Sequence, residues 1–339
     1  IMELPAIDRL RQSVPDATIT AIGAKPAVEV LAGDRRMDRI VSIQGWGMEH
    51  LGDTPDEQSR RRFVDWLVGN CFDLILDPSH AAGFVNQTIH EHYTHIMDTT
   101  CARPDIALAQ GADGLSALMR AIHQGWGLEV PESWYPSLPL ASTEASWARG
   151  FLETRGAGEN VVAVSPGASH DLKRWPTGHF AKLCRHLTQE LDAQVLLFCG
   201  PHETGILDEL TEQAGDLCRL HLVRNLHLRK VAALLSRCRL YLGNDSGLMH
   251  LAAAVQTPVV IVFGPTTPRL YLPRGVRSRA IVSPVECPHR LHTTFGHPPC
   301  VHANRCLIGT PCIASVDPDD VIRAVEEEYS LQMQSLAKS

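Results

Sequence analysis

The architecture can be read first from Leu240-Tyr-Leu-Gly-Asn-Asp-Ser-Gly-Leu-Met-His-Leu-Ala-Ala-Ala-Val-Gln-Thr-Pro-Val-Val-Ile-Val-Phe-Gly-Pro-Thr266. Its pattern predicts a strand over 239–243, a turn at 244–247, a helix over 248–255 and a second strand over 258–263. The polar turn residues supply N-cap chemistry. The uninterrupted apolar run of the second strand is typical of a parallel sheet that is covered on both faces. We therefore predict a doubly wound α/β domain, in which ligands bind where the strands end.

The turn itself carries side chains and backbone groups suited to a phosphorylated sugar. The free N–H groups at Ser246 and Gly247, where the helix starts, favour an anion such as a diphosphate. Asp245 adds a carboxylate that can bind sugar hydroxyls, and His250 lies one turn after Ser246 on the same helix face. An N-cap Asp-Ser pair followed by a packed helix histidine is the alternative interpretation, and the tetrapeptide alone favours it.

A longer motif favours the ligand-binding interpretation over the N-cap interpretation. Asn244-Asp-Ser-Gly-x-x-His250-x-Ala-Ala253, followed by Thr257-Pro258 and Phe263-Gly-Pro-Thr266, resembles the signature of glycosyltransferase family 9, the ADP-heptose:lipopolysaccharide heptosyltransferases. The second half of the chain matches in order, and the first half matches loosely in layout. The resemblance implies two Rossmann-like domains that face each other across a cleft, the GT-B type of α/β fold. We expect an acceptor-binding domain over 1–141 and a nucleotide-sugar-binding domain over 142–339, because the segment before the boundary is rich in proline.

The alternation of short apolar runs and amphipathic segments supports two α/β domains. Strands are predicted over 17–24, 39–43, 73–77, 161–165, 194–199, 220–223 and 280–282. Helices are predicted over 1–14, 27–31, 57–68, 115–126, 143–153, 177–191, 204–214, 228–238 and 317–329.

Composition excludes several classes of protein. The formal charge of −7 argues against nucleic acid as the main partner. No apolar run approaches the roughly 18–20 residues of a membrane span. The ten cysteines lie mostly in apolar segments, which is typical of reduced, buried thiols in the cytosol. We expect a cytoplasmic protein, and the resemblance leaves open a peripheral contact with the cytoplasmic face of the inner membrane.

A second loop joins the candidate site. It begins with Ser165-Pro-Gly and ends with Lys173-x-Trp-Pro176, and its small residues let the backbone approach a ligand. Its basic side chains can hold a departing diphosphate without a metal, although a solvent-facing basic turn is the commoner role of a Lys-Arg pair. The loop resembles the donor loop of the family, which implies that Lys173 contacts the diphosphate. Ser169 and Arg174 are further donor-binding candidates.

Glu203 follows the predicted strand over 194–199 and loosely matches the position that binds the donor ribose in the family. A surface glutamate is the alternative interpretation of this residue. The sequence contains no G-x-x-x-x-G-K-[ST], G-x-G-x-x-G or G-x-S-x-G motif. This removes the usual arguments for a P-loop NTPase, a dinucleotide dehydrogenase and an α/β-hydrolase.

Two clusters invite a metal interpretation. The run His90-Glu-His-Tyr-Thr-His95 fails the H-E-x-x-H pattern, because Thr94 stands where the second histidine is required. We predict a polar loop there. Cys287, Cys300, Cys306 and Cys312, with interleaved histidines, could furnish a zinc site, but no C-x2-C pair is present. We expect no metal.

The catalytic residue is not assigned. The resemblance implies that an Asp in a Gly-Asp turn after the first strand removes the acceptor's proton. That turn precedes a helix resembling Ile1-Met-Glu-Leu-Pro-Ala-Ile-Asp8, so we expect the strand and its Asp upstream of Ile1. Asp8 lies too far along the helix to replace it. The alternative is a donor-binding relative without catalysis.

The resemblance to this family implies an inverting, metal-independent transferase that moves heptose from ADP-heptose to an inner-core lipopolysaccharide sugar. No cofactor is expected besides the nucleotide sugar. Lys173 and the turn at 246–247 would stabilise the departing ADP, Asp245 would orient the heptose, and His250 would support the turn. A transferase for another nucleotide sugar and a non-catalytic nucleotide-sugar-binding protein remain alternatives.

Overall fold

The chain divides into two compact units, which are described separately here. The computed structural model describes residues 4–49, 53–73, 75–77, 84–92, 96–98, 135–200, 203–215, 218–290 and 298–336. Unit 1 is Ile1–Trp134 and unit 2 is Tyr135–Ser339. Along the chain, the two units meet between residues 134 and 135, seven residues before the boundary expected after residue 141. The helix predicted over 115–126 lies outside the described residues.

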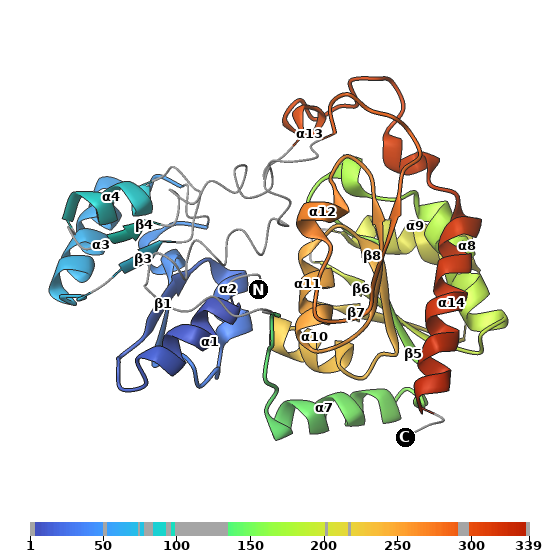
Figure 1. Cartoon of the computed structure of the whole chain (residues 1–339), viewed down its shortest axis with the longest axis horizontal. Helices are drawn as coiled ribbons and strands as arrows, with labels where there is room; N and C mark the ends of the chain where they lie inside the picture. The colour runs from blue at the N-terminus through green and yellow to red at the C-terminus, as the bar shows by residue number, and fades with distance from the viewer. Residues whose placement is uncertain are drawn as a thin grey trace. The chain divides into compact units, whose positions relative to one another are not determined.

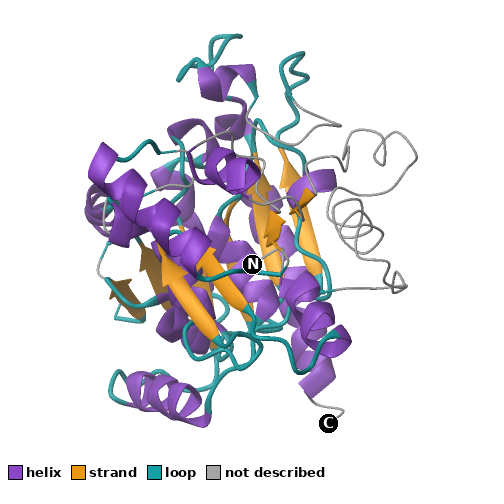
Figure 2. Ribbon diagram, turned by 90° about the vertical axis from the view of Figure 1, so that its left-hand side faces the viewer, coloured by secondary structure: helices purple, strands orange, loops and turns teal. Residues whose placement is uncertain are grey.

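Unit 2 is built on a six-stranded, wholly parallel sheet (Figures 1 and 2). Its strands are β5 (Val161–Ser165), β6 (Gln194–Cys199), β7 (Leu220–Arg224), β8 (Leu240–Asn244), β9 (Val259–Phe263) and β10 (Ser278–Val282). The spatial order is β10-β9-β8-β5-β6-β7. This is the Rossmann order 3-2-1-4-5-6 read from the opposite edge, with the order reversing between β5 and β8. The predicted Rossmann-like domain is confirmed.

Helices cover both faces of this sheet, as Figure 1 shows for α14 on one side and α11 on the other. They are α7 (Ser142–Glu153), α8 (Thr177–Gln189), α9 (Thr204–Ala214), α10 (Leu228–Leu235), α11 (Gly247–Ala254), α12 (Pro268–Tyr271), α13 (Pro299–His302) and α14 (Pro318–Leu336). Two short 3₁₀ turns, Asp171–Lys173 and Cys312–Ser315, lie in loops. No helix in the described residues is both long and apolar enough to cross a membrane.

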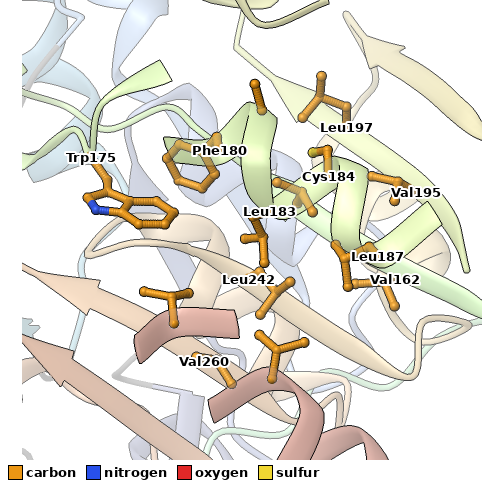
Figure 3. Close-up of a cluster of buried hydrophobic side chains, with 14 of the residues drawn as sticks. Val162, Trp175, Phe180, Leu183, Cys184, Leu187, Val195, Leu197, Leu242 and Val260 are labelled. Carbon is orange, nitrogen blue, oxygen red and sulfur yellow. The ribbon is translucent and has the colours of Figure 1, made fainter. Parts of the chain in front are cut away.

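The core of unit 2 follows from alternation along the strands. Val162, Leu242 and Val260 are at most 1% exposed and belong to the cluster that packs against α8, α9 and α14 (Figure 3). Their chain neighbours point to the opposite face, because successive side chains of a strand alternate. β5, β8 and β9 are buried at every position. Each fully buried aliphatic side chain contributes roughly 1.5–3 kcal/mol.

Unit 1 contains shorter elements. They are α1 (Leu4–Ser13), β1 (Thr20–Gly23), α2 (Lys25–Leu31), β2 (Arg39–Ser42), the 3₁₀ turn Ile43–Trp46, α3 (Glu57–Gly69), β3 (Ile75–Asp77), α4 (Phe84–His92) and β4 (Ile96–Asp98). β1 pairs in parallel with β2, and β3 pairs in parallel with β4. Among the described residues, no strand joins these two pairs. The strand expected before Ile1 stays a prediction.

The polar loop predicted over 90–95 is corrected in part. Residues 90–92 continue helix α4, where the imidazole Nδ1 of His92 lies 2.9 Å from the carbonyl of Thr88, so they are not a loop. Residues 93–95 lie outside the described residues. Helix α7 begins at Ser142, one residue before the predicted start, and Glu144 accepts the Ala141 N–H at 2.7 Å.

Candidate functional site

The site lies at the carboxyl ends of β5 and β8, which are hydrogen-bonded neighbours. Ser165, the last residue of β5, is in register with Gly243 of β8. The loop after β5 (166–176, the donor loop) and the turn after β8 (245–247, the signature turn) therefore leave the same edge of the sheet side by side. This is the switch point at which doubly wound sheets bind their ligands.

Asn244 ties the two segments together. It is fully buried, and its Nδ2 donates to the carbonyls of Pro166 at 2.8 Å and Gly167 at 3.2 Å. Its Oδ1 accepts the backbone N–H of Trp175 at 3.0 Å. One side chain thus holds both ends of the donor loop, and all of its bonds go to backbone groups. Sequence analysis treated Asn244 only as a turn residue and missed this role.

The structure brings Lys173 and Asp245 into direct contact. Lys173 Nζ lies 2.8 Å from Asp245 Oδ2, and the two side chains are only 10% and 7% exposed. The hydroxyl of Thr266, which follows β9, donates to the same Oδ2 at 2.7 Å. An ammonium and a carboxylate thus share a buried position at the switch point. The sequence motif contained Thr266 but assigned it no role.

Helix α11 presents its N-terminus at this position. Ser246 is the N-cap residue with an extended backbone, and its side chain makes no capping bond. Its Oγ is buried and lies beside the Tyr241 hydroxyl. The first N–H groups of a helix also have no intrahelical acceptor. At the signature turn these groups, together with Gly247, are available to an anion.

His250 lies on α11 beside the ion pair. Burial lowers its pKa to about 4, although the carboxylate of Asp245 opposes the shift, and the positive charge of Lys173 lowers it further. The imidazole is therefore neutral near pH 7. A neutral ring adds no repulsion toward the Lys173 ammonium, and it can offer one donor and one acceptor to the turn.

Tyr241 explains why β8 carries a glycine. A Cβ on Gly243 would lie 2.7 Å from the Tyr241 hydroxyl and 2.9 Å from the Ser165 carbonyl, so neither neighbour leaves room for a side chain. Burial raises the pKa of Tyr241 to about 12. The Tyr241 hydroxyl is buried, and the neighbouring Ser246 and Ser165 side chains oppose the rise in its pKa. This neutral phenol lies directly beneath the edge of the sheet where both loops begin.

The remaining donor-binding candidates occupy different positions. A Cβ on Gly167 would lie 2.1 Å from the Glu203 carboxylate, so Glu203 packs against the donor loop, and its Oε2 accepts the Gly200 N–H at 2.9 Å. Arg174 pairs with Asp171 at 2.6 Å within the loop. Ser169 is exposed. The structure thus gathers Lys173, Asp245, Ser246, Gly247 and His250 at one turn, adds Glu203 beside the donor loop, and leaves Ser169 and Arg174 outside this contact. The donor-binding roles of all these residues stay predictions.

The cysteine-rich segment is a separate feature. Cys300 and Cys312 are buried, whereas Cys287 and Cys306 are partly exposed. Burial raises the pKa of the Cys300 and Cys312 thiols. In the part of the chain that the structure describes, no group of three or more His, Cys, Asp and Glu side chains is arranged to hold a metal ion.

Comparison of structures defines the class of fold. A family 9 glycosyltransferase from Veillonella parvula superposes with a TM-score of 0.71 at 18% identity, covering 96% of this chain and 92% of that chain. The Escherichia coli ADP-heptose lipopolysaccharide heptosyltransferase II superposes with a TM-score of 0.66 at 20% identity, covering 98% and 95%. The fold is the two-Rossmann-domain, GT-B type fold of these glycosyltransferases.

Comparison of sequences gives the family. The sequence model described as glycosyltransferase family 9 (heptosyltransferase) matches residues 106–297, which is more than half of the chain. The chain belongs to glycosyltransferase family 9. Lipopolysaccharide heptosyltransferase 2 of Escherichia coli is 36% identical over 159 residues, which cover 45% of this chain and 44% of that protein. The aligned segment thus spans less than half of that relative.

Proposed function

We propose that this protein transfers heptose from ADP-heptose to a sugar of the lipopolysaccharide inner core. The observation that carries the proposal is the contact of Lys173 with Asp245 at the N-terminus of α11, at the switch point of a Rossmann sheet. A nucleoside diphosphate sugar has an anionic centre flanked by hydroxyl groups. The candidate site places a cation and free backbone N–H groups, which suit the diphosphate, beside a carboxylate, which suits the sugar hydroxyls.

The diphosphate would be bound by Lys173 and by the N–H groups of the signature turn. These groups favour the negative charge that develops on the departing ADP, and they do so without reorganisation during the reaction. Their negative counterpart, Asp245, would accept hydrogen bonds from heptose hydroxyls. Glu203 would do the same for the ribose, since it lies against the donor loop.

The proposed reaction is a single displacement with inversion. A hydroxyl of the acceptor attacks the anomeric carbon of heptose, the bond to the diphosphate oxygen breaks, and ADP leaves with both electrons of that bond. The acceptor's proton passes to a base that the described residues do not identify. Relatives such as lipopolysaccharide heptosyltransferase 3 of Escherichia coli, which is 24% identical over 278 residues, support the proposed acceptor.

A direct test is transfer of heptose from ADP-heptose to heptose-deficient lipopolysaccharide, with product followed by mass spectrometry. Calorimetry with ADP, UDP and GDP tests the nucleotide, and we expect ADP to bind most tightly. Tighter binding of UDP would indicate another nucleotide sugar. Binding of ADP-heptose without turnover would support a non-catalytic nucleotide-sugar-binding protein.

Lys173→Ala tests the diphosphate contact. A charge-assisted hydrogen bond contributes roughly 1.5–3 kcal/mol, so ADP affinity should fall by about tenfold to a hundredfold. Lys182→Ala is the matched control, because Lys182 pairs with Asp319 at 2.6 Å away from the site. Equal ADP affinity in the two variants would exclude Lys173 from the donor site.

The proposal includes independence from metal ions, because the donor loop carries Lys173 and Arg174 where a metal-dependent transferase needs carboxylates. Turnover in EDTA should equal turnover without it. Loss that Mg²⁺ or Mn²⁺ restores would contradict this expectation. Loss that only Zn²⁺ restores would instead indicate a structural site at the cysteine-rich segment.

The proposed acceptor is anchored in a membrane, so we propose a peripheral contact with the cytoplasmic face of the inner membrane. Flotation with vesicles that contain heptose-deficient lipopolysaccharide, compared with vesicles that lack it, tests this contact. Transfer to a soluble, deacylated acceptor with no flotation would restrict the proposal to the sugar-transfer step.

A further inference from the structure

We propose that Thr266 is a positioning residue that, with Lys173, makes the site prefer a sugar-bearing nucleotide to bare ADP. The inference rests on the proposed function and concerns selection between donor substrate and nucleotide product. Its basis is that one carboxylate oxygen, Asp245 Oδ2, receives both the Lys173 ammonium at 2.8 Å and the Thr266 hydroxyl at 2.7 Å.

The side chains of Lys173, Asp245 and Thr266 form a buried cluster. As whole residues, backbone included, Lys173 is 8% exposed, Asp245 is 5% exposed and Thr266 is 3% exposed. In the described part of the chain, no hydrogen bond reaches the other carboxylate oxygen, Oδ1. Oδ2 is therefore held from two sides, while Oδ1 remains for a ligand.

Thr266 is itself fixed by packing. It follows Gly264, where a Cβ would lie 2.6 Å from the Cβ of Ile313. This close approach sets the path of the chain after β9. The Thr266 hydroxyl therefore reaches Asp245 from a closely packed segment, and we expect this bond to limit rotation of the carboxylate.

A ligand that binds Lys173 must compete with Asp245. Bare ADP places negative charge beside Asp245 and draws the ammonium toward the phosphates, and it offers nothing to the carboxylate in return. Leaving a buried charge without its partner is strongly unfavourable. A nucleotide sugar places hydroxyl donors near the same carboxylate, which replace the lost contact. The donor is thereby favoured over ADP, and release of the product is assisted.

Two substitutions separate the effect of the Asp245 charge from the effect of the orientation of its carboxylate. Asp245→Asn keeps the shape and removes the negative charge, so ADP should bind severalfold more tightly, and the preference for ADP-heptose should fall toward one. Thr266→Val removes only the hydroxyl that orients the carboxylate. A hydrogen bond to a charged group of about 1.5 kcal/mol corresponds to roughly a tenfold loss of that preference. Thr266→Ser should restore it.

The experiment is calorimetry on the full chain with ADP and with ADP-heptose in the absence of acceptor, reported as the ratio of their dissociation constants. With acceptor present, Thr266→Val should raise KM for the donor more than it lowers kcat. Thr188→Val is the matched control, because its buried hydroxyl donates to Cys184 within α8 at 3.0 Å, away from the site. The control should leave the ratio unchanged.

The possible failures are distinguishable. If the wild-type protein binds neither ADP nor ADP-heptose, the proposed function itself is wrong. If it binds both, and Thr266→Val keeps the wild-type ratio while remaining folded, the inference is overturned and the donor site stands. Weaker ADP binding by Asp245→Asn would likewise overturn the competition between Asp245 and the diphosphate. Should Asp245→Asn not fold, Thr266→Val and Thr266→Ser still decide the outcome.

Discussion

The two units use parallel strands in different ways. In unit 2, six strands form one sheet, and its central strands β5, β8 and β9 are buried along their whole length. In unit 1, the described strands form two separate pairs, and only the last residue of β1 is buried. Parallel sheets depend on helices that cover both faces. The β1–β2 pair of unit 1 has less of that protection.

The described core of unit 1 contains a cluster of aromatic side chains. Trp46 and Phe63 meet edge to face at 4.9 Å, and Trp66 and Phe84 lie within the same cluster. Aromatic pairs add about 0.5–1.5 kcal/mol beyond their burial. The comparison shows that a wide buried sheet carries the proposed donor site, whereas an aromatic cluster between loops and helices organises the described part of unit 1.

The largest expected effect tests this difference in the strands. Leu242→Ala, in β8, should cost roughly 2–5 kcal/mol of unfolding free energy, because Leu242 is 1% exposed in a closely packed core. Ile22→Ala, in β1, should cost less than half as much, because Ile22 is only partly buried. Urea unfolding of both variants, followed by circular dichroism, compares them. Equal losses would contradict the contrast between the two sheets.

The second-largest expected effect is a difference between the two units in how their stability depends on pH. The pKa of His250 in unit 2 is lowered to about 4 by burial, so the unfolded chain binds a proton below its usual pKa of 6.5 while the folded chain does not. Stability of unit 2 should therefore fall as pH decreases from about 6.5 to 4, by up to about 3 kcal/mol. Burial lowers the pKa of His179 and His221 as well, which acts in the same direction.

His250→Gln should flatten this part of the pH profile. In unit 1, a backbone hydrogen bond from Ile19 and a hydrogen bond from Arg11 lower the pKa of Asp38. The stability that the Asp38 carboxylate contributes is therefore lost only below the usual carboxylate pKa. Thermal unfolding from pH 7 to pH 4 checks both expectations. An unchanged slope in His250→Gln would contradict the assignment.

A smaller effect is expected where unit 2 packs without spare volume. Gly264→Ala would bring a Cβ within 2.6 Å of Ile313 Cβ, and neither group is the end of a flexible chain. Overpacking of this kind costs about 1–3 kcal/mol. Gly45→Ala is the control in unit 1, because nothing lies within 4 Å of its added Cβ. Differential scanning calorimetry should show a lowered transition only in the first variant.

The smallest effect should come from the surface of unit 1. Arg61 pairs with Glu57 along α3, but the two side chains are 76% and 68% exposed. Such pairs contribute about 0.3–0.5 kcal/mol and are screened by salt. Arg61→Ala should shift urea unfolding by no more than this amount, and not at all at 1 M salt. A larger shift would show that charges, besides the aromatic cluster, stabilise unit 1.

Local pattern predicted most of the elements of unit 2. β5 and β6 have the predicted bounds, and β9, the strand after α11, begins one residue later than expected. Continuous apolar runs and the polar Asn-Asp-Ser-Gly turn are local signals, and tertiary contacts reinforce them. Helix ends were less predictable. α10 stops at Leu235 and α14 continues to Leu336, because the end of a helix depends on what its last turn contacts.

The sequence by itself determined the Rossmann class of unit 2, the signature turn and the basic donor loop, since periodicity and turn chemistry act between near neighbours. Only the tertiary structure decided that Asn244 holds Trp175, 69 residues earlier, and that Thr266 reaches Asp245 from 21 residues beyond it. Those contacts depend on the order of strands in the sheet. Strand order is set by packing of the whole domain, and no local pattern encodes which strand ends become neighbours.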